Sequence, residues 1–320
     1  MKTRIILVVC LQLISIYIVA QIEQQMVPSE MKQLTAITEP ATLMKGFFRV
    51  GMVYDHAFVK KLYDENANKI VLPGSSLSQT RALSITLQYG ITDRFQVNLL
   101  LPFEFDLIQQ SALWEDPLFR QKTIATWNQK GVGIGDLSFG LNSQIIKESD
   151  QFPSITAFGL ITVPTGRKDI TNVVDQRNYD LPTGSGEIRL SLDLQARKIV
   201  YPYSFIFIAS IEYPLGGEKI LSPGGEKTSF KSGQVYRITG GVNFHLNDWL
   251  SMANNLDYQY ISEAEIDNNP VGYNPWALQY HPYFHFQIRR LRFIQSVLIP
   301  LKGKYYSADP HYNFILQFII

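Results

Sequence analysis

The chain has 320 residues, of which 29 are Lys or Arg and 28 are Asp or Glu, so its formal charge is +1. This near balance does not indicate nucleic-acid binding, which requires many basic residues against the phosphates. The single cysteine, Cys10, lies in the apolar N-terminal stretch, so the chain beyond it can form neither disulfides nor thiolate sites.

The first 20 residues are typical of a secretory signal peptide. Lys2 and Arg4 precede an apolar stretch, and the small residue Ala20 stands before polar Gln21. A membrane anchor is the alternative, but the apolar stretch is short for a helical span of about 20 residues. Cleavage near Ala20 would remove two of the 29 basic residues, leaving 27 against 28 acidic ones. The next segment, 21–45, is either a loose periplasmic tail or an inserted plug, and the sequence leaves both open.

From residue 46 to the C-terminus, apolar and polar residues alternate in about twelve segments. In the clearest segment, from Glu187 to Arg197, every second residue is apolar. A period of two indicates a strand with one apolar and one polar face. The predicted strands are 47–55, 82–89, 95–103, 136–145, 154–163, 187–197, 204–213, 235–245, 249–260, 276–289, 291–301 and 311–320.

The links between these strands alternate in length. Short links follow the even-numbered strands, and longer links follow the odd-numbered ones. The predicted long links are 58–78, 104–131, 164–186, 214–232, 261–275 and the shorter 302–309. Short periplasmic turns and long outer loops are typical of outer-membrane barrels.

These patterns together predict the fold class. No stretch after residue 20 is long and apolar enough for a transmembrane helix, and alternating strands account for a mean hydropathy of −0.03. A soluble β-sandwich also has alternating strands, but it does not explain the signal peptide, the loop rhythm and the apolar last strand together. We expect residues 46–320 to form an all-β, transmembrane, antiparallel up-and-down β-barrel of about 12 strands.

Several motifs resemble one family of outer-membrane proteins. The sequences are GIGDLSFGL at 133–141, YGITDRFQV at 89–97 and VPTG at 163–166, with LPTG at 181–184 echoing the last. They resemble the "MetA-pathway of phenol degradation" family. The resemblance implies a 12-stranded outer-membrane barrel that transports small, often hydrophobic or aromatic compounds, and it assigns no role to any residue. The Ala20–Gln21 junction suggests a Bacteroidetes-like Gram-negative source.

The polar strand faces are expected to line the lumen. Folding each hairpin on its turn places Arg189 opposite Glu212, and Arg237 opposite Asp257, as ion pairs. A slip of one residue would turn such charges toward lipid, at about 2–4 kcal/mol for a mid-membrane Arg. These pairs either fill a narrow barrel or form a constriction that selects solutes. The candidate lumen residues are Asp136, Glu187, Arg189, Asp193, Glu212, Arg237, Asp257, His281 and His285.

The mixed signs of these residues, with Arg197 beside them, do not indicate strong anion or cation selectivity. His281 and His285 face inward on one strand and His245 on another, but two His without further ligands are too few for a metal site. Hairpin folding sets Ser296 opposite His285, without an orienting acid or amide for a hydrolytic site. We expect no metal, no cofactor and no enzymatic activity.

The link 104–131 is the longest and contains three candidate contact residues, Trp114, Phe119 and Trp127. They could fold inward to meet an aromatic solute, or pack on the rim in the interfacial belt. The sequence therefore predicts an outer-membrane channel for small solutes, with hydrophobic or aromatic compounds suggested by the resemblance alone. The alternatives are a structural or surface-interaction barrel with a plugged lumen and, third, a barrel hydrolase. The expected partners are outer-membrane lipids, the outer-membrane assembly machinery and a small-molecule solute, without nucleic acid.

Overall fold

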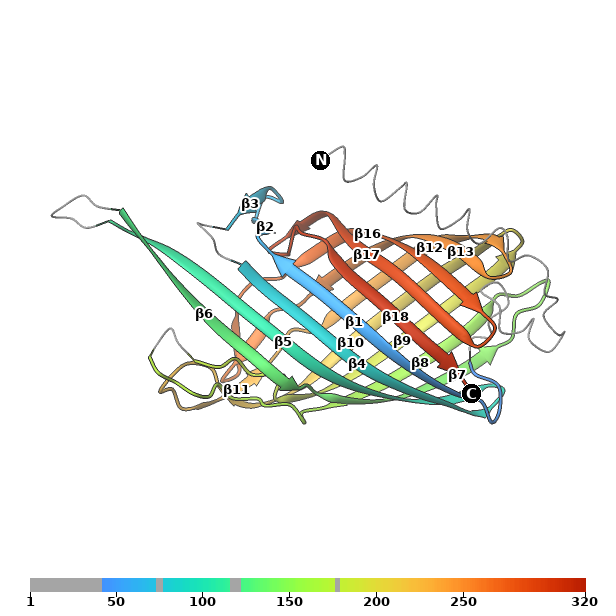
Figure 1. Cartoon of the computed structure of the whole chain (residues 1–320), viewed down its shortest axis with the longest axis horizontal. Helices are drawn as coiled ribbons and strands as arrows, with labels where there is room; N and C mark the ends of the chain where they lie inside the picture. Colours follow the sequence, from blue (N-terminus) through green and yellow to red (C-terminus); the bar gives the residue numbers. More distant parts are fainter. Residues whose placement is uncertain (1–41, 73–76, 116–121, 176–178) are drawn as a thin grey trace.

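The computed structural model describes residues 42–72, 77–115, 122–175 and 179–320, and of residues 110–115 and 122–127 only the backbone. Twelve antiparallel strands form a closed barrel (Figure 1), and pairing of the last strand with the first completes it. The barrel strands are β1 (Phe48–Val59), β4 (Leu77–Thr92), β5 (Phe95–Glu115), β7 (Leu137–Ile146), β8 (Ser154–Val163), β9 (Glu187–Val200), β10 (Tyr203–Ile220), β12 (Val235–Asn247), β13 (Leu250–Ile261), β16 (Trp276–Ile288), β17 (Leu291–Lys304) and β18 (His311–Ile319). All twelve predicted strands are therefore confirmed.

The barrel has two unlike ends. Short turns join β4 to β5, β9 to β10, β12 to β13 and β16 to β17 at the end that also carries the C-terminus. We call this the turn end, and the opposite end, where the long connections lie, the loop end. In outer-membrane barrels these ends face the periplasm and the exterior respectively.

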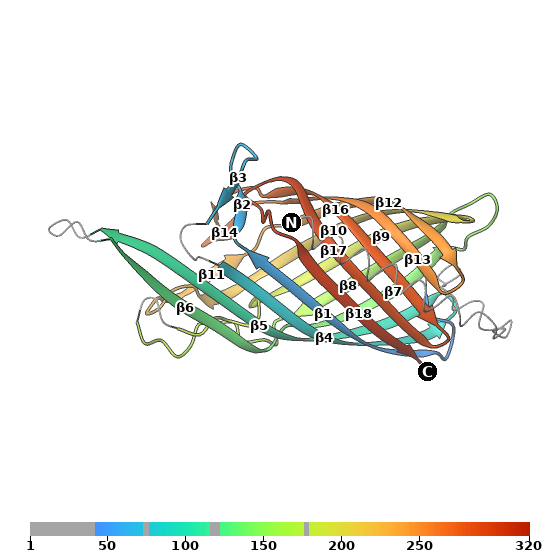
Figure 2. The same cartoon turned by 45° about the horizontal axis from the view of Figure 1, so that its top comes forward.

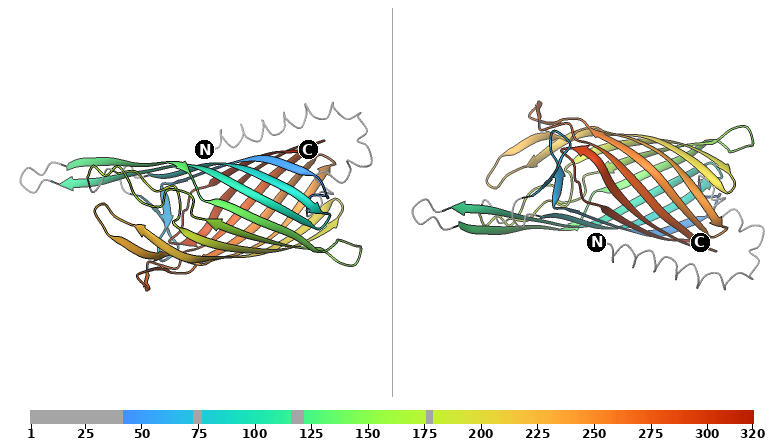
Figure 3. Two further views of the ribbon diagram at one scale, coloured as in Figure 1. Left: turned by 90° about the horizontal axis from the view of Figure 1, so that it is seen from below. Right: turned by 90° about the horizontal axis from the view of Figure 1, so that it is seen from above.

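The segment 104–131 is not a loop as predicted. β5 continues to Glu115, and β6 (Lys122–Ile134) pairs with it from Phe103 onward, so a long hairpin projects beyond the other strands (Figures 1, 2 and 3). The alternation that marks the strand in fact continues past Phe103, because the apolar residues Phe105 and Leu107 alternate with the acidic residues Glu104 and Asp106. The predicted end of this strand was therefore too early.

Other long links also contain short strands at the loop end. β2 (Lys61–Tyr63) pairs with β3 (Lys69–Val71), β11 (Lys227–Lys231) pairs with the end of β10, and β14 (Ala264–Ile266) pairs with β15 (Asn269–Val271). The β2–β3 hairpin is attached to the link between β17 and β18. Tyr63 exchanges backbone hydrogen bonds of 2.9 Å with Tyr305 and Tyr306, and the Asp309 carboxylate accepts from the Lys61 N–H at 2.7 Å. The β2–β3 hairpin and the link between β17 and β18 thus form one structural unit at the loop end.

The burial pattern is inverted relative to a soluble protein. Among the described residues, buried polar side chains far outnumber buried apolar ones, whereas large apolar side chains such as Leu192 (55% exposed) cover the outside. A soluble sandwich would bury the apolar faces. An apolar band outside and polar groups inside are what a lipid-embedded barrel requires. Among the described residues, no helix is long and apolar enough to cross a membrane.

Candidate functional site

The lumen contains two adjoining cavities. The larger, of about 560 Å³, lies toward the turn end and is lined from nearly every side of the barrel, for example by Arg49, Asn142 and His285. The smaller, of about 410 Å³, lies against the wall formed by β4 to β10. Gln88, Asn142 and Gln195 line both cavities, so the two cavities adjoin at these residues. Their sizes fall in the range of small-molecule sites.

The two cavities differ in chemistry. The smaller cavity has apolar lining residues on two strands, Phe158 and Leu160 of β8 and Ile208 of β10, with β9 between them. These residues stand at inward positions that polar residues occupy elsewhere on the same strands, for example Ser154. Polar side chains, among them Asp193, complete the wall. The lumen can therefore contact both an apolar body and a polar group of a solute.

A tyrosine extends along the wall of the larger cavity. Tyr283 of β16 lies at the same level as Ala253 on the adjacent strand β13 and Asn243 on β12, the next strand beyond it. Ala253 is fully buried and small, and the Tyr283 side chain passes it to donate a hydrogen bond of 3.2 Å from Oη to Asn243 Oδ1. The small side chain of Ala253 thus leaves room for the phenol of Tyr283 to reach Asn243.

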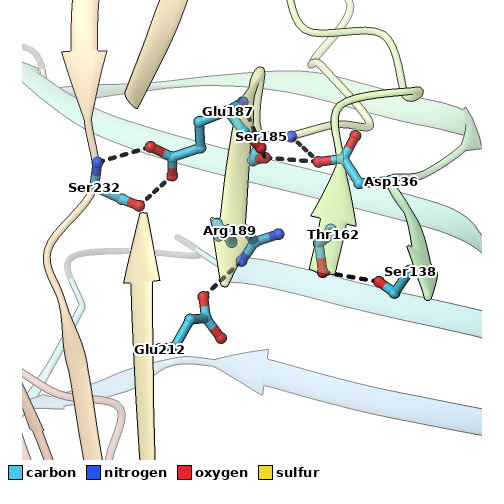
Figure 4. Close-up of polar contacts among 8 residues, drawn as sticks. All are labelled: Asp136, Ser138, Thr162, Ser185, Glu187, Arg189, Glu212 and Ser232. Carbon is cyan, nitrogen blue, oxygen red and sulfur yellow. Dashed lines mark hydrogen bonds and ion pairs between the residues drawn. The ribbon is translucent and has the colours of Figure 1, made fainter. Parts of the chain in front are cut away.

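The loop end of the lumen is organised around Asp136 (Figure 4). Its carboxylate accepts hydrogen bonds from the Gly166 N–H at 3.0 Å, and from both the N–H and the hydroxyl of Ser185 at 2.6 Å. The backbones of Gly166 and Gly184 pack closely against each other, since a Cβ on Gly166 would lie 2.8 Å from the Gly184 Cα. The motifs GIGD, VPTG and LPTG therefore meet at one point, which ties the connection between β8 and β9 to the barrel.

Glu187 extends the same network toward the next connection. Its side chain is 2% exposed, and its carboxylate accepts from the Ser232 N–H at 3.0 Å and from the Ser232 hydroxyl (Figure 4). Its own N–H donates to the Ser185 hydroxyl at 3.3 Å. Asp136 and Glu187 thus bind connecting segments and do not line either of the two cavities described above.

The predicted ion pair between Arg189 and Glu212 is confirmed, at 3.1 Å between Nη1 and Oε1 (Figure 4). The two residues are diagonal neighbours rather than directly opposite, because Arg189 faces Pro214 and Glu212 faces Ser191. About a third of each side chain is exposed, so the pair lies in a wet part of the lumen.

The predicted pair of Arg237 with Asp257 is wrong. Arg237 faces Gln259 and donates to its Oε1 at 3.2 Å. Asp257 instead accepts from His281 of the next strand, at 3.1 Å between Oδ2 and Nδ1. The true register differs from the predicted one by two residues, because the hairpin closes nearer the C-terminus than predicted. An even error leaves each residue on its predicted face.

The predicted placement of Ser296 opposite His285 is also wrong by two residues, here in the other direction along the chain. His285 faces Ile294, and Ser296 faces Tyr283. Both Ser296 and His285 line the larger cavity. His245 forms a contact of 3.1 Å between Nε2 and the Ser204 hydroxyl. Within the described part of the chain, no three potential metal ligands of the His, Cys, Asp or Glu type are grouped.

The contact candidates of the long hairpin cannot be placed. Trp114 and Trp127 belong to β5 and β6, but their side chains lie outside what the structure describes, and Phe119 lies outside the described residues altogether. A different aromatic residue reaches the lumen. Tyr306, in the link before β18, approaches Gln259 at 3.5 Å. Burial is the main cause that raises the pKa of its phenol above the usual value.

Residues 42–45 lie at the turn end of the lumen. Leu43 is 2% exposed, lines the larger cavity and donates its N–H to Gln96 Oε1 at 2.8 Å. The segment passes over Gly90, where a Cβ would lie 2.1 Å from the Met44 carbonyl oxygen. The C-terminal part of the predicted tail or plug is thus in contact with the barrel interior, and residues 21–41 lie outside the described chain.

Sequence reasoning missed several cavity residues. Arg49, Asp55, Tyr283 and Arg292 all line the larger cavity. Tyr283 and Arg292 occupy inward positions in predicted strands, so parity alone could have found them. Arg49 and Asp55 lie on the less regular first strand, where Gly51 and Ala57 interrupt the alternation.

No family model matches the chain. The COG4313 outer membrane channel from Pseudomonas putida F1 is similar in structure, with a TM-score of 0.69 and 13% identity over 92% of this chain and 100% of that chain. The translocator domain of autotransporter NalP from Neisseria meningitidis has a TM-score of 0.49 and 7% identity over 87% of this chain and 88% of that chain. For the CymD monoaromatic hydrocarbon channel the values are 0.44 and 9%, over 92% of each chain.

The first of these similarities establishes the fold, and the other two are too distant to support an argument. Together with the closed sheet and the apolar exterior, it defines the chain as a 12-stranded transmembrane β-barrel of the outer-membrane type. The chain shares its fold with the Pseudomonas putida channel. The resemblance to the MetA-pathway family remains a prediction.

Proposed function

We propose that this protein is an outer-membrane channel for small solutes that carry an apolar, in particular aromatic, body. The supporting observation is the pair of adjoining lumen cavities, of which the smaller is lined by the apolar residues Phe158, Leu160 and Ile208 and the larger mostly by polar residues. A purely structural barrel gains nothing from such space, because small barrels are stabilised by side chains that fill them. An aromatic solute would stack on Phe158 while polar groups of the opposite wall hold its substituent.

The remaining features of the sequence fit this role. Residues 1–20 would direct export, with cleavage near Ala20, and the assembly machinery of a Gram-negative outer membrane would insert the barrel. The segment 21–45 would then enter from the periplasm, since Leu43 already lines the turn end of the lumen. The similar Pseudomonas putida protein is described as an outer membrane channel, which accords with the proposal.

Conductance of refolded residues 21–320 in planar bilayers tests the proposal. We expect discrete current steps that small aromatic solutes block. Phe158→Ala should weaken the block, because it removes the apolar surface of the inner wall. Phe139→Ala is the matched control, since Phe139 is 50% exposed on the lipid-facing side of the neighbouring strand. A folded barrel that passes no current and takes up no solute into liposomes would instead support the plugged structural barrel.

A further inference from the structure

Arg81 of β4 interrupts the apolar outer face of the barrel near the loop end. The strands β18, β1, β4 and β5 lie side by side in one wall (Figure 1). From Arg81 toward the turn end, every outward residue of β4 is apolar or aromatic, namely Leu83, Ile85, Leu87, Tyr89 and Ile91. Arg81 continues the same alternation and is exposed. It therefore presents a cation on the lipid-facing wall.

The position of Arg81 along β4 places it at the outer edge of the apolar band. Arg81 stands ten positions from Ile91. At about 3.3 Å per residue and a strand tilt of about 40°, that stretch rises about 25 Å along the barrel axis. The apolar band of outer-membrane barrels is also about 25 Å tall. Arg81 therefore lies at the depth where lipid headgroups meet the hydrocarbon.

Aromatic side chains flank Arg81 at this level. In the register of the sheet, His56 of β1 lies between Tyr312 of β18 and Arg81 of β4. Phe105 of β5 lies on the other side of Arg81. The centroid of the His56 ring is 6.4 Å from that of Tyr312 and 6.0 Å from that of Phe58. Aromatic rings on both sides of a cation are suited to the boundary between hydrocarbon and headgroups.

Gln79, the next outward residue of β4, orients the guanidinium group of Arg81. The amide oxygen of Gln79 accepts hydrogen bonds from Arg81 Nη2 at 2.8 Å and from Arg81 Nε at 3.1 Å. It also accepts one from His56 Nε2 at 2.8 Å. A guanidinium group has five N–H donors, so the two bonds to Gln79 leave the donors on Nη1 and one on Nη2 available to a ligand. Because the group is already held, binding a ligand costs less conformational entropy.

The strands around Arg81 carry no outward carboxylate near it. Asp55 is the only acidic residue of β1, β4, β17 and β18, and it lines the larger cavity inside the barrel. On β5, Glu104 and Asp106 alternate with the outward residue Phe105, so both acidic side chains face the lumen. In the described part of this wall, the charge that Arg81 presents to the lipid is therefore not balanced by an acidic side chain.

We propose that Arg81, oriented by Gln79 and flanked by aromatic rings, binds the phosphate group of an outer-leaflet lipid. The guanidinium group can donate two parallel hydrogen bonds to two phosphate oxygens. Tyr312 and Phe105 would contact the apolar part of the same lipid just below its headgroup. The site lies on the outside of the barrel and does not depend on whether the lumen conducts.

Native mass spectrometry of refolded residues 21–320 in detergent micelles tests the site with two matched lipids. Dioleoylphosphatidic acid carries a phosphate, and dioleoylglycerol has the same acyl chains without it. We expect phosphatidic acid to bind about tenfold or more tightly, because its hydrogen bonds to Arg81 are charge-assisted. Arg81→Gln should remove most of this preference. Gln79→Ala should weaken it by about threefold, because the guanidinium group is then no longer held.

Arg94→Gln is the matched control, since Arg94 is an exposed arginine in the turn between β4 and β5, at the opposite end of the barrel. It should keep the full preference. Inorganic phosphate, added at the concentration of the lipid, should not displace phosphatidic acid, because it lacks the apolar part. Displacement by inorganic phosphate would overturn the lipid as the ligand.

Equal binding of phosphatidic acid and dioleoylglycerol to wild type would overturn the inference. So would a preference that persists in Arg81→Gln and Gln79→Ala, or one that Arg94→Gln loses to the same extent. The two test variants change different side chains, so the test remains valid if one of them does not fold.

Discussion

Replacing Asp136 by alanine should release the connection between β8 and β9 while leaving the barrel intact. The carboxylate is 5% exposed and accepts three hydrogen bonds, two from backbone N–H groups and one from the Ser185 hydroxyl. Hydrogen bonds to charged groups contribute about 1.5–3 kcal/mol each, and buried donors left unpaired cost a similar amount. Because the bonds share one carboxylate and the freed loop can bind water, we expect a net cost of about 2–4 kcal/mol for closing the loop.

Limited trypsin digestion in detergent measures this cost. Arg167 in the connection is held closed, since its N–H donates to Thr183 Oγ1 at 3.3 Å, so cleavage there requires opening. When opening is in rapid equilibrium, a loss of 2–4 kcal/mol raises the cleavage rate by about 30- to 1000-fold. Asp150→Ala, at an exposed position, should leave the rate unchanged. A rate for Asp136→Ala within about threefold of wild type would refute the reasoning that the carboxylate holds the loop.

Three further predictions concern the lumen and its ends. Gly90→Ala should displace the N-terminal segment and raise single-channel conductance. The control is Gly159→Ala, because a Cβ at that position would have no atom within 4 Å; it should change neither conductance nor melting temperature. Arg189→Ala should lower the unfolding free energy by less than about 1 kcal/mol, because its pair with Glu212 is exposed to water; a change in conductance without a change in stability would place the pair at a constriction. Burial raises the pKa of Tyr306, so ionisation of its phenol destabilises the folded state, and the melting temperature of wild type should fall relative to that of Tyr306→Phe as pH rises above about 10.

The hairpin registers show which inferences from sequence are robust. The predicted partners in the hairpins β9–β10, β12–β13 and β16–β17 were each wrong by two residues, yet every residue remained on its predicted face. Side chains alternate with a period of two, so an even shift moves a partner but not a face. The Arg189–Glu212 pair survived this error because long side chains reach a diagonal neighbour. The side chain of Asp257 is shorter, and it pairs with His281 of the adjacent strand instead.

The alternation of apolar and polar residues therefore determined the strands, their inner and outer faces and the closed barrel, because a lipid environment imposes that pattern residue by residue. The loop motifs did not reveal that Asp136 would gather Gly166 and Ser185, since the contacts span up to 49 positions in the chain. Nor could spacing show that Arg49, Arg197 and Arg292 line one cavity. Strands far apart in sequence meet there only when the barrel closes, so the composition of the lumen wall is a property of the tertiary structure.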